Sequence, residues 1–550
     1  MSNIDPGQAI PVAEAKPEKR VKAVEIENLS FAYLGNEEPA ITVDHFEIMD
    51  GESVLIVGKS GEGKSTFVNT INGVIPHIFR GNYKGTVKVY GRVVAETPIS
   101  KLCTVVGTLL QDPESQILNY TVEEEVAFGP ENLALPPEEI RERIEEAIKE
   151  TGISHIRNRE TYVLSGGELQ RVALAAVLAM NTPMLILDEP TSNIDPETTD
   201  RIFELLRSLR QRKTLIIVEH KVERVLPFVD RVVLIRKGKI KFDIPKEKLI
   251  YYLDDLAEAG VEVPVQFEYA RKLNLDTIDL DTIRRKIKEN NVPVPTYERY
   301  KPKRIIMEAK SKVWVEDKIK GTFTILDAEM NVGEGEIVAM MGQNGAGKST
   351  FLKSIVGFLD KTALRYDAKV VVEGVDLSKA TIQERGRYIT FVPQTFELTI
   401  ITQRVESEVA YSLKKHGVKN WKERLEELLE MFSLKEYRDK DPLTLSMGQE
   451  RRVVMASALG SGAKIIMLDE PTSGQDFYHK EILGQELKKL QKLGYSFVIV
   501  THDSRFVYRY ADRVVVLHKG RKVLDGTPEE VFERSEEYGI PPPAEYLIRV

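Results

Sequence analysis

Residues 58–66 read Gly58-Lys59-Ser60-Gly61-Glu62-Gly63-Lys64-Ser65-Thr66. They fit the pattern G-x-x-x-x-G-K-[ST], in which glycines let successive backbone N–H groups converge on phosphate oxygens. The apolar run 53–57 before them is typical of a buried parallel strand, and residues 67–71 after them continue a helix. The helix N-terminus adds partial positive charge at the same point. We therefore predict a phosphate-binding loop in which Lys64 contacts the β- and γ-phosphates and Ser65 holds Mg²⁺.

The same pattern returns in residues 342–350, which read Gly342-Gln343-Asn344-Gly345-Ala346-Gly347-Lys348-Ser349-Thr350. This loop starts 284 residues after the first one. Other features repeat at nearly the same spacing: Gln111 with Gln394 and His220 with His502. A glycine-rich turn that only caps a helix would explain one match but not this repeat. A chain of 550 residues with so long a period holds two copies of one globular unit.

The composition excludes several classes of protein. A formal net charge of −8 gives no general electrostatic case for nucleic acid binding. The one cysteine, Cys103, excludes disulfides within the chain and clusters of cysteine ligands. No run of 18 apolar residues and no N-terminal signal peptide is visible. We therefore expect a chain that stays in the cytoplasm and does not insert directly into a membrane.

Changes in composition divide the chain into five segments. The first 22 residues carry prolines and few apolar side chains, which is typical of a mobile tail. Prolines and charges also mark the stretch between the two copies, although residues 279–290 have a helical pattern. We predict a tail at 1–22, domain 1 at 23–245, a C-terminal extension and linker at 246–303, domain 2 at 304–535, and a second C-terminal extension at 536–550.

Apolar runs in both copies end in side chains that can do chemistry. Two runs end in an aspartate–glutamate pair, Asp188-Glu189 and Asp469-Glu470. Two further runs end at His220 and His502. Ligands of α/β sheets bind at the carboxyl ends of the strands, so these side chains should gather near the phosphate loops. A single histidine at a strand end is usually structural, but two at equivalent places indicate a shared function.

An aromatic residue precedes each phosphate loop. Tyr33 lies 25 residues before the first loop, and Trp314 lies 28 residues before the second. Either ring could stack on a purine base. Packing within the sheet is the alternative, and the sequence leaves it open.

Two segments between the phosphate loops and the carboxylate pairs carry a family resemblance. They read Leu164-Ser165-Gly166-Gly167-Glu168-Leu169-Gln170-Arg171 and Leu445-Ser446-Met447-Gly448-Gln449-Glu450-Arg451-Arg452. They resemble the signature LSGGQ of ABC ATPases. The resemblance implies an α/β fold with two P-loop ABC-type nucleotide-binding domains, each with a mostly parallel core sheet, an antiparallel β part and a helical subdomain. It also implies two composite sites, each with ATP between one domain's phosphate loop and the other's signature.

The resemblance implies a role for each matching residue. The first copy would bind ATP through Tyr33, Gly58, Lys59, Ser60, Gly61, Gly63, Lys64, Ser65, Thr66, Ser165, Gly166, Gly167 and Glu168. The second copy would bind it through Trp314, Gly342, Gln343, Asn344, Gly345, Gly347, Lys348, Ser349, Thr350, Ser446, Gly448 and Gln449. The Mg²⁺ ligands would be Ser65, Gln111, Asp188, Ser349, Gln394 and Asp469. The catalytic set would be Glu189 and Glu470 for the attacking water, His220 and His502 for the γ-phosphate, and Gln111 and Gln394 for closure.

Two further features concern communication between the sites. The segments Ser192-Asn193-Ile194-Asp195 and Ser473-Gly474-Gln475-Asp476 resemble D-loops, which connect one site to the other. The signatures depart from LSGGQ at Glu168 and Met447. Because neither change removes a catalytic group, we expect two working sites with unequal rates.

Within the ABC ATPases, residues 111–133 resemble the ATPases of energy-coupling factor transporters, which import vitamins and transition metals. They include Gln111-Asp112-Pro113-Glu114-Ser115-Gln116 and the run VEEEVAFGPENL at 122–133. Residues 72–77, NGVIPH, are similar to the fused two-ATPase members. The second copy departs from this pattern, with PQTFE at 393–397. The resemblance implies a peripheral motor at the cytoplasmic face of the cell membrane, bound to a transmembrane coupling protein and a substrate-binding membrane subunit.

Two alternatives remain. A soluble tandem ABC ATPase acting on ribosomes or nucleic acid would also carry two units in one chain. Its iron–sulfur members need many cysteines, and its ribosome-associated members usually have a long basic helical linker. A sugar-importer ATPase is a third possibility, against which residues 111–133 argue. The transported substrate is expected to depend on another chain.

Overall fold

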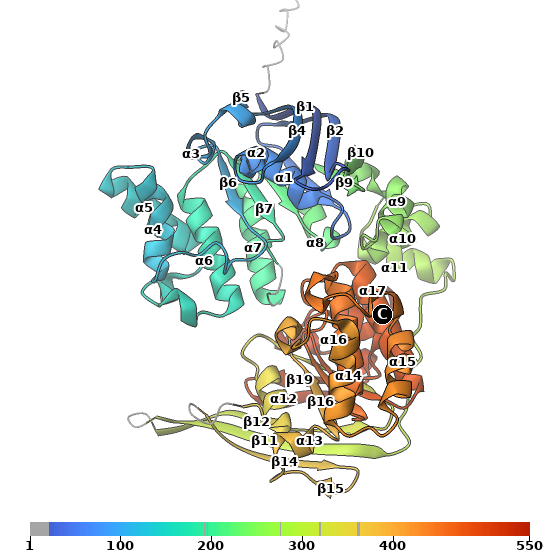
Figure 1. The fold of residues 1–550 in the computed structure, drawn as a ribbon. Helices are drawn as coiled ribbons and strands as arrows, with labels where there is room; N and C mark the ends of the chain where they lie inside the picture. The colour runs from blue at the N-terminus through green and yellow to red at the C-terminus, as the bar shows by residue number, and fades with distance from the viewer. Residues whose placement is uncertain (1–20, 192–193, 195, 276, 318–320, 360–363) are drawn as a thin grey trace, which may run out of the picture.

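The computed structural model describes residues 21–550 apart from 192, 193, 195, 276, 318–320 and 360–363. Figure 1 shows two α/β units, one above the other, with a group of helices at one side of their junction. We call residues 22–245 unit one and residues 304–535 unit two. Residues 1–20 of the predicted tail lie outside the described part. Within that part, no helix is both long enough and apolar enough to span a lipid bilayer.

Unit one is built on one ten-stranded sheet. Its order is β5-β4-β1-β2-β10-β9-β3-β8-β7-β6, and β6, β7, β8, β3 and β9 are parallel. A single residue pair between β10 and β2 joins this parallel part to the antiparallel strands β1, β2, β4 and β5. The strands are β1 (Lys22–Tyr33), β2 (Ile41–Met49), β3 (Ser53–Val57), β4 (Gly81–Val89), β5 (Arg92–Val93), β6 (Val106–Leu109), β7 (Met184–Asp188), β8 (Thr214–Val218), β9 (Arg231–Arg236) and β10 (Lys239–Pro245).

Unit two divides the same strands between two sheets. The antiparallel sheet has the order β12-β11-β14-β15, and the mostly parallel sheet has the order β16-β17-β18-β13-β19-β20. The strands are β11 (Ile305–Asp317), β12 (Gly321–Gly333), β13 (Ile337–Met341), β14 (Arg365–Val372), β15 (Val375–Asp376), β16 (Ile389–Val392), β17 (Ile465–Asp469), β18 (Ser496–Val500), β19 (Arg513–His518) and β20 (Arg521–Gly526). The predicted fold class, two units with parallel and antiparallel parts, is confirmed.

The helices of unit one are α1 (Lys64–Asn72), α2 (Val74–His77), α3 (Ile99–Leu102), α4 (Val122–Asn132), α5 (Pro137–Glu150), α6 (Gly166–Ala179), α7 (Pro196–Leu209) and α8 (Val222–Val225). Those of unit two are α12 (Lys348–Val356), α13 (Ile382–Arg385), α14 (Val405–Lys415), α15 (Trp421–Met431), α16 (Met447–Leu459), α17 (Phe477–Lys492), α18 (Ser504–Tyr510) and α19 (Pro528–Phe532). Helices α4–α6 pack together at one side of unit one (Figure 1). They and their counterparts α14–α16 are the predicted helical subdomains.

The central strands explain why the predicted functional residues converge. All five residues of β3, β7 and β8 are buried, as are those of β13, β17 and β18. Continuous apolar runs of this kind suit parallel strands that are covered on both faces. Because the strands are parallel, their carboxyl ends meet at one edge of each sheet. That edge carries a phosphate loop, an aspartate–glutamate pair and a histidine in each unit.

The stretch between the units is folded rather than extended. It contains α9 (Leu253–Glu258), α10 (Val265–Lys272) and α11 (Leu280–Glu289), the last of which matches the helix predicted at 279–290. Helix α20 (Ala544–Arg549), from the second predicted extension, packs against α10 and α11. Their shared core includes Val265, Tyr269, Ile283, Ile287 and Ile548. We call α10, α11 and α20 together the linker body.

The linker body gives a test of how firmly α20 is attached. Ile548 is 1% exposed, so Ile548→Ala should leave a cavity and lower the free energy of unfolding by about 2–4 kcal/mol. Chemical denaturation followed by fluorescence measures this change. Val550→Ala is the control, because Val550 is 59% exposed and its truncation should cost less than about 0.5 kcal/mol. Equal effects of the two substitutions would contradict the packing described here.

Candidate functional site

Each phosphate loop joins a buried strand to a helix that begins at its lysine. Gly63 and Gly347 cap helices α1 and α12 with φ angles of 100° and 99°, a left-handed conformation that favours glycine. A Cβ atom on Gly63 would lie 2.6 Å from the carbonyl oxygen of Ala40. The glycine is therefore required both by its conformation and by the close backbone approach that curls the loop around an anion.

The lysine of each loop lies inside it. Lys64 Nζ donates to the carbonyl oxygens of Gly58 at 2.7 Å and Lys59 at 3.1 Å. Lys348 makes the matching two bonds at 2.8 and 3.1 Å. Both lysines are 6% exposed, and burial lowers the pKa of Lys64. Each ammonium group is positioned to exchange these carbonyl oxygens for the oxygens of a phosphate.

A hydroxyl and a carboxylate meet at the start of α1 and of α12. Ser349 Oγ donates to Asp469 Oδ1 at 2.9 Å, and Ser65 makes a hydrogen bond to Asp188. Burial and the nearby Glu189 raise the pKa of Asp188 to about 6, and the bond from Ser65 opposes this shift. Mg²⁺ takes oxygen ligands, commonly one or two carboxylates together with phosphate oxygens and waters. These donors fit a Mg²⁺ ion that is held mainly by a nucleotide.

Three predicted catalytic side chains of unit one meet at Glu189. Its Oε1 lies 3.0 Å from Nε2 of His220, and its Oε2 accepts from Nε2 of Gln111 at 3.0 Å. Burial raises the pKa of Glu189, but the hydrogen bond to His220 and the nearby Lys64 outweigh burial and hold this pKa below its usual value. Glu189 is therefore ionised at neutral pH and can polarise a water that attacks a phosphate.

Unit two brings together the matching groups with a different charge balance. Nε2 of His502 lies 3.1 Å from Oε1 of Glu470 and 3.3 Å from Nζ of Lys348. Burial raises the pKa of Glu470, with Lys348 opposing and Asp469 reinforcing the shift. Gln394 lines a small cavity beside Asp469. The two units therefore share a geometry but differ in the proton affinity of the central glutamate.

The two predicted aromatic residues make different contacts. Tyr33 OH lies 3.1 Å from Oγ1 of Thr66, the last residue of the first phosphate loop. Its ring also meets Phe79 edge to face, with the centroids 6.1 Å apart. The Nε1 atom of Trp314 instead donates to Oε1 of Glu316 at 3.3 Å. Tyr33 thus lies beside the first phosphate loop.

Strand register explains why Trp314 is placed differently. Ala32 pairs with Asn82 between β1 and β4, and Trp314 pairs with Arg365 between β11 and β14. The tight turns that follow β4 and β14 are separated by the same 283 residues as Asn82 and Arg365. Trp314 therefore corresponds to Ala32, one residue before the position equivalent to Tyr33, although the sequence places both aromatic residues at comparable distances from their phosphate loops. Because neighbouring residues of a strand face opposite sides of the sheet, Trp314 faces the side that Ala32 faces in unit one, and Tyr33 faces the other side.

The signature segments begin helices α6 and α16 with the same cap. Glu168 N donates to Ser165 Oγ at 3.4 Å, and Ser165 N donates to Glu168 Oε2 at 2.9 Å. In unit two, Ser446 N donates to Gln449 Oε1 at 3.0 Å in an equivalent capping box. Glutamate and glutamine serve equally at this third helical position. Glu168 therefore keeps the structural role of the usual glutamine, and the side chain of Met447 lies outside the described part.

A direct contact joins unit two to the first phosphate loop. Ser60 N donates to Oδ2 of Asp476, the last residue of the predicted D-loop of unit two, at 3.1 Å. Burial raises the pKa of Asp476, but hydrogen bonds from His479 and Ser60 outweigh burial and hold the pKa well below its usual value. Lys59 Nζ lies 3.7 Å from the centroid of the Tyr478 ring. The first site is therefore built from both units.

Sequence reasoning missed part of this contact. It named Asp476 only as a member of a D-loop, and it did not name Tyr478. No local pattern marks Tyr478, because its partner Lys59 is 419 residues away in the chain. The repeat, combined with a head-to-tail arrangement, is the signal that could have placed the start of α17 at the first loop. Of the matching D-loop in unit one, residues 192, 193 and 195 lie outside the described part.

Comparison with known proteins identifies the family. A profile described as ABC transporter matches residues 42–192 and 325–473, one stretch in each unit. This chain belongs to the ABC transporter family. A Saccharolobus solfataricus protein whose name assigns it to the ABC transporter ATP-binding proteins is 49% identical over 529 residues, 96% of this chain and 98% of its own length. A similarly named Methanosarcina acetivorans protein is 33% identical over 545 residues, 94% of this chain and 88% of its own.

A solved structure shares the fold of nearly the whole chain. A chain in the structure of ribosome-bound archaeal Pelota and ABCE1 matches with a TM-score of 0.62 and covers 93% of this chain and 80% of its own. At 21% identity this likeness shows the fold alone. The ABC family and its relatives establish that the chain is an ATP-binding protein and an ATPase.

The two central glutamates give a first test of the ABC sites. Glu189→Gln together with Glu470→Gln should lower kcat by a factor of about 10²–10⁴, because no carboxylate remains to polarise water. ATP binding should persist, since the phosphate loops are unchanged. Phosphate release and equilibrium nucleotide binding measure the two effects. Glu334→Gln, which removes an exposed partner of Arg304, is the control. Near-normal turnover of the double variant would refute these roles.

The register of β1 and β11 gives a second test. Tyr33→Ala should raise KM for ATP about 3- to 10-fold, the equivalent of a lost aromatic contact of about 0.5–1.5 kcal/mol. Tyr33→Phe keeps the ring, removes the contact to Thr66 and should change KM less. Trp314→Ala should leave KM within about twofold, because Trp314 occupies the place of Ala32. An equal rise for Tyr33→Ala and Trp314→Ala would refute the register argument.

Proposed function

We propose that this chain is the ATP-hydrolysing motor subunit of an importer of the energy-coupling factor type, which takes up vitamins or transition metals. The observation that carries the proposal is a matched set of exposed apolar side chains beside the glutamine loops of both units. The exposed fractions are 71% for Leu118 and 62% for Ile401, 42% for Phe128 and 47% for Tyr411, and 66% for Tyr162 and 61% for Leu443. We call these six residues the apolar docking set.

The loops that carry Leu118 and Ile401 are held in the same way in the two units. The carboxylate of Glu125 is buried and accepts N–H groups from Leu118 and the residue after it, at 2.9 and 2.8 Å. Glu408 accepts the matching N–H groups from Ile401 and the residue after it, at 3.1 and 2.9 Å. A buried acceptor fixes each loop backbone and leaves the apolar side chain at its tip exposed. This recurrence supports docking by both halves, although PQTFE at 393–397 departs from the family pattern.

The position of the docking set would let a bound protein partner affect ATP hydrolysis. Its residues lie on α4 and α14, on the short turns Thr161–Val163 and Pro442–Thr444, and in the loops after Gln111 and Gln394. Gln111 donates to Glu189, so a partner that moves this loop would move a group bonded to the central glutamate. Gathered apolar side chains favour a protein partner that covers them. A transmembrane coupling protein fits this role, with the motor at the cytoplasmic face of the membrane and a separate membrane subunit binding the substrate.

The nucleotide cycle in this proposal uses Mg²⁺. Ser65 and Asp188 would hold the ion in unit one, and Ser349 and Asp469 in unit two, since each pair already brings two oxygen ligands together. Gln111 and Gln394 would complete the two sites. Mg²⁺ would neutralise the charge that develops on the phosphates, while the side chains of the chain orient the attacking water.

A soluble tandem ABC ATPase that acts on ribosomes is the second candidate. It is favoured by the ribosome-bound ABCE1 structure, which aligns with 93% of this chain. The iron–sulfur members of that class need several cysteines, and this chain has one, Cys103. A net charge of −8 gives no attraction to RNA. The resemblance of residues 111–133 to energy-coupling factor ATPases favours the importer over both this candidate and a sugar-importer ATPase.

Copurification from native membranes tests the proposed function. Phe128→Glu together with Tyr411→Glu should reduce recovery of the chain with its membrane proteins at least about tenfold, because charge in an apolar interface is costly. Hydrolysis by the purified chain should stay within about twofold. Tyr251→Glu is the control, since Tyr251 is 76% exposed and lies outside the docking set. Recovery with ribosomes, unaffected by the double substitution, would support the second candidate instead.

A further inference from the structure

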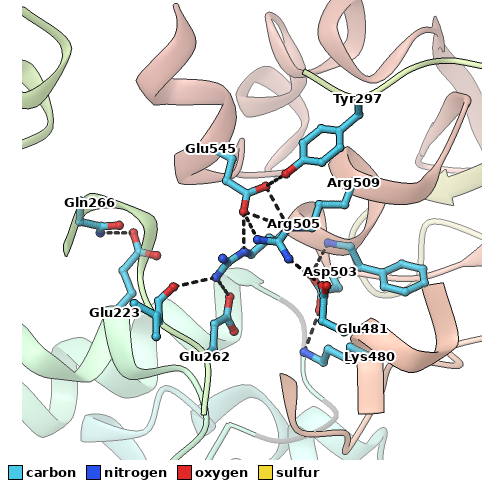
Figure 2. Close-up of polar contacts among 12 residues, drawn as sticks. Glu223, Glu262, Gln266, Tyr297, Lys480, Glu481, Asp503, Arg505, Arg509 and Glu545 are labelled. Atoms are coloured by element: carbon cyan, nitrogen blue, oxygen red, sulfur yellow. Dashed lines mark hydrogen bonds and ion pairs between the residues drawn. The ribbon is translucent and has the colours of Figure 1, made fainter. Parts of the chain in front are cut away.

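A buried cluster of charged side chains lies where unit two meets the linker body (Figure 2). Its centre is Glu545 on α20, which is 4% exposed. The Glu545 carboxylate accepts from Nε of Arg505 at 2.9 Å, from Nε of Arg509 at 2.9 Å and from the hydroxyl of Tyr297 at 3.2 Å. Both arginines lie on α18, the helix that follows His502. The Glu545 carboxylate therefore connects α20 to α18, the helix that follows the predicted γ-phosphate ligand His502.

The cluster continues toward unit one. The Nη1 atom of Arg505 makes an ion pair with Glu262 and donates to the carbonyl oxygen of Val263 at 3.3 Å. Close by, Nε2 of Gln266 donates to Oε1 of Glu223 at 2.6 Å, and Glu223 lies on α8 of unit one. Figure 2 shows the Gln266–Glu223 pair beside the contacts of Arg505, as a separate contact between α8 and α10.

The same arginines fix the first turns of α17. Their guanidinium groups lie over the ring of Phe477, 5.2 and 5.5 Å from its centroid. Nη1 of Arg509 lies 2.7 Å from Oε1 of Glu481. From the neighbouring residue of α17, Nζ of Lys480 lies 2.7 Å from Oδ2 of Asp503, the residue that caps α18. Two ion pairs, Arg509–Glu481 and Lys480–Asp503, therefore hold helices α17 and α18 together.

The start of α17 also touches the first ATP site. Phe477 directly follows Asp476, whose carboxylate accepts from the Ser60 amide. Tyr478 follows next and lies against Lys59. The position of α17 against α18 thus determines where Asp476 and Tyr478 stand relative to the phosphate loop of unit one.

We propose that Glu545 is a positioning residue for the first ATP site. Through Arg505 and Arg509 it holds α17 so that Asp476 stays against the Ser60 amide. Removing the negative charge would leave two buried guanidinium groups beside a neutral partner, which is unfavourable and would loosen α18 and α17 together. Glu545 acts through these helices rather than by touching the nucleotide. The proposal rests on ATPase activity alone and not on the importer assignment.

Hydrogen exchange of the full chain tests the proposal directly. In Glu545→Gln, exchange in peptides that span residues 58–66 should be at least about fivefold faster, because the Ser60 amide loses its fixed acceptor. Glu537→Gln is the matched control. It removes a carboxylate from the same C-terminal region, where Glu537 pairs with Arg534 at 3.0 Å on the surface, and exchange should not change. Unchanged exchange in Glu545→Gln, or an equal acceleration at residues 342–350, would overturn the proposal.

Turnover in two backgrounds separates positioning from general loss of structure. With Glu470→Gln, which leaves the first site as the intact one, Glu545→Gln should lower kcat about tenfold, as misplacement of a supporting group does. With Glu189→Gln, which leaves the second site intact, it should change kcat less than about twofold. Tyr297→Phe removes one bond to Glu545, keeps the ring and should produce a smaller loss at the first site only. Equal losses in both backgrounds would count against positioning.

Discussion

The hydrogen bond between the Ser60 amide and the Asp476 carboxylate places unit two directly against the first phosphate loop. Asp476 uses its other oxygen to accept the backbone N–H of His479 at 3.0 Å, so one carboxylate both caps α17 and reaches the opposite unit. A hydrogen bond from a backbone N–H to a charged acceptor is stronger than one to a neutral acceptor. The N–H group belongs to Ser60 in the curled backbone of the first phosphate loop. The geometry of this loop therefore also determines where the start of α17 lies.

The two ATP sites share a backbone but have diverged in their side chains. The glycines that cap α1 and α12 impose the same curl on both loops, since their conformation leaves little alternative. The groups around that frame are less constrained. Tyr33 has no aromatic equivalent at the matching register position. Burial raises the pKa of both central glutamates, but the contacts of Glu189 outweigh it, so the pKa is lowered for Glu189 and raised for Glu470. These differences, rather than the changes in the signature segments, are the stronger physical basis for the expectation that the two sites turn over at unequal rates.

Much of the site could be predicted because its chemistry depends on short patterns. A loop of the G-x-x-x-x-G-K-[ST] type fixes a backbone, and buried runs that end in Asp188-Glu189 or at His220 fix a strand edge. The placement of Trp314 could not be predicted, because it depends on the register between β11 and β14. The sequence predicts α11 of the linker body, but the packing of α10, α11 and α20 on one core was equally hidden. Its apolar residues lie on three helices of 8, 10 and 6 residues, and more than 250 residues separate Ile287 from Ile548.

The sharing of one small core between α10, α11 and α20 also sets an order of events during protein synthesis. Translation proceeds from the N-terminus at about 5–20 residues per second, so Ile548 follows Ile283 by roughly 10–50 s. Throughout that interval the apolar faces of α10 and α11 have no α20 to cover them. A nascent chain can therefore complete the fold of unit one early, but its first catalytic centre is finished only when almost the whole of the printed sequence has been made.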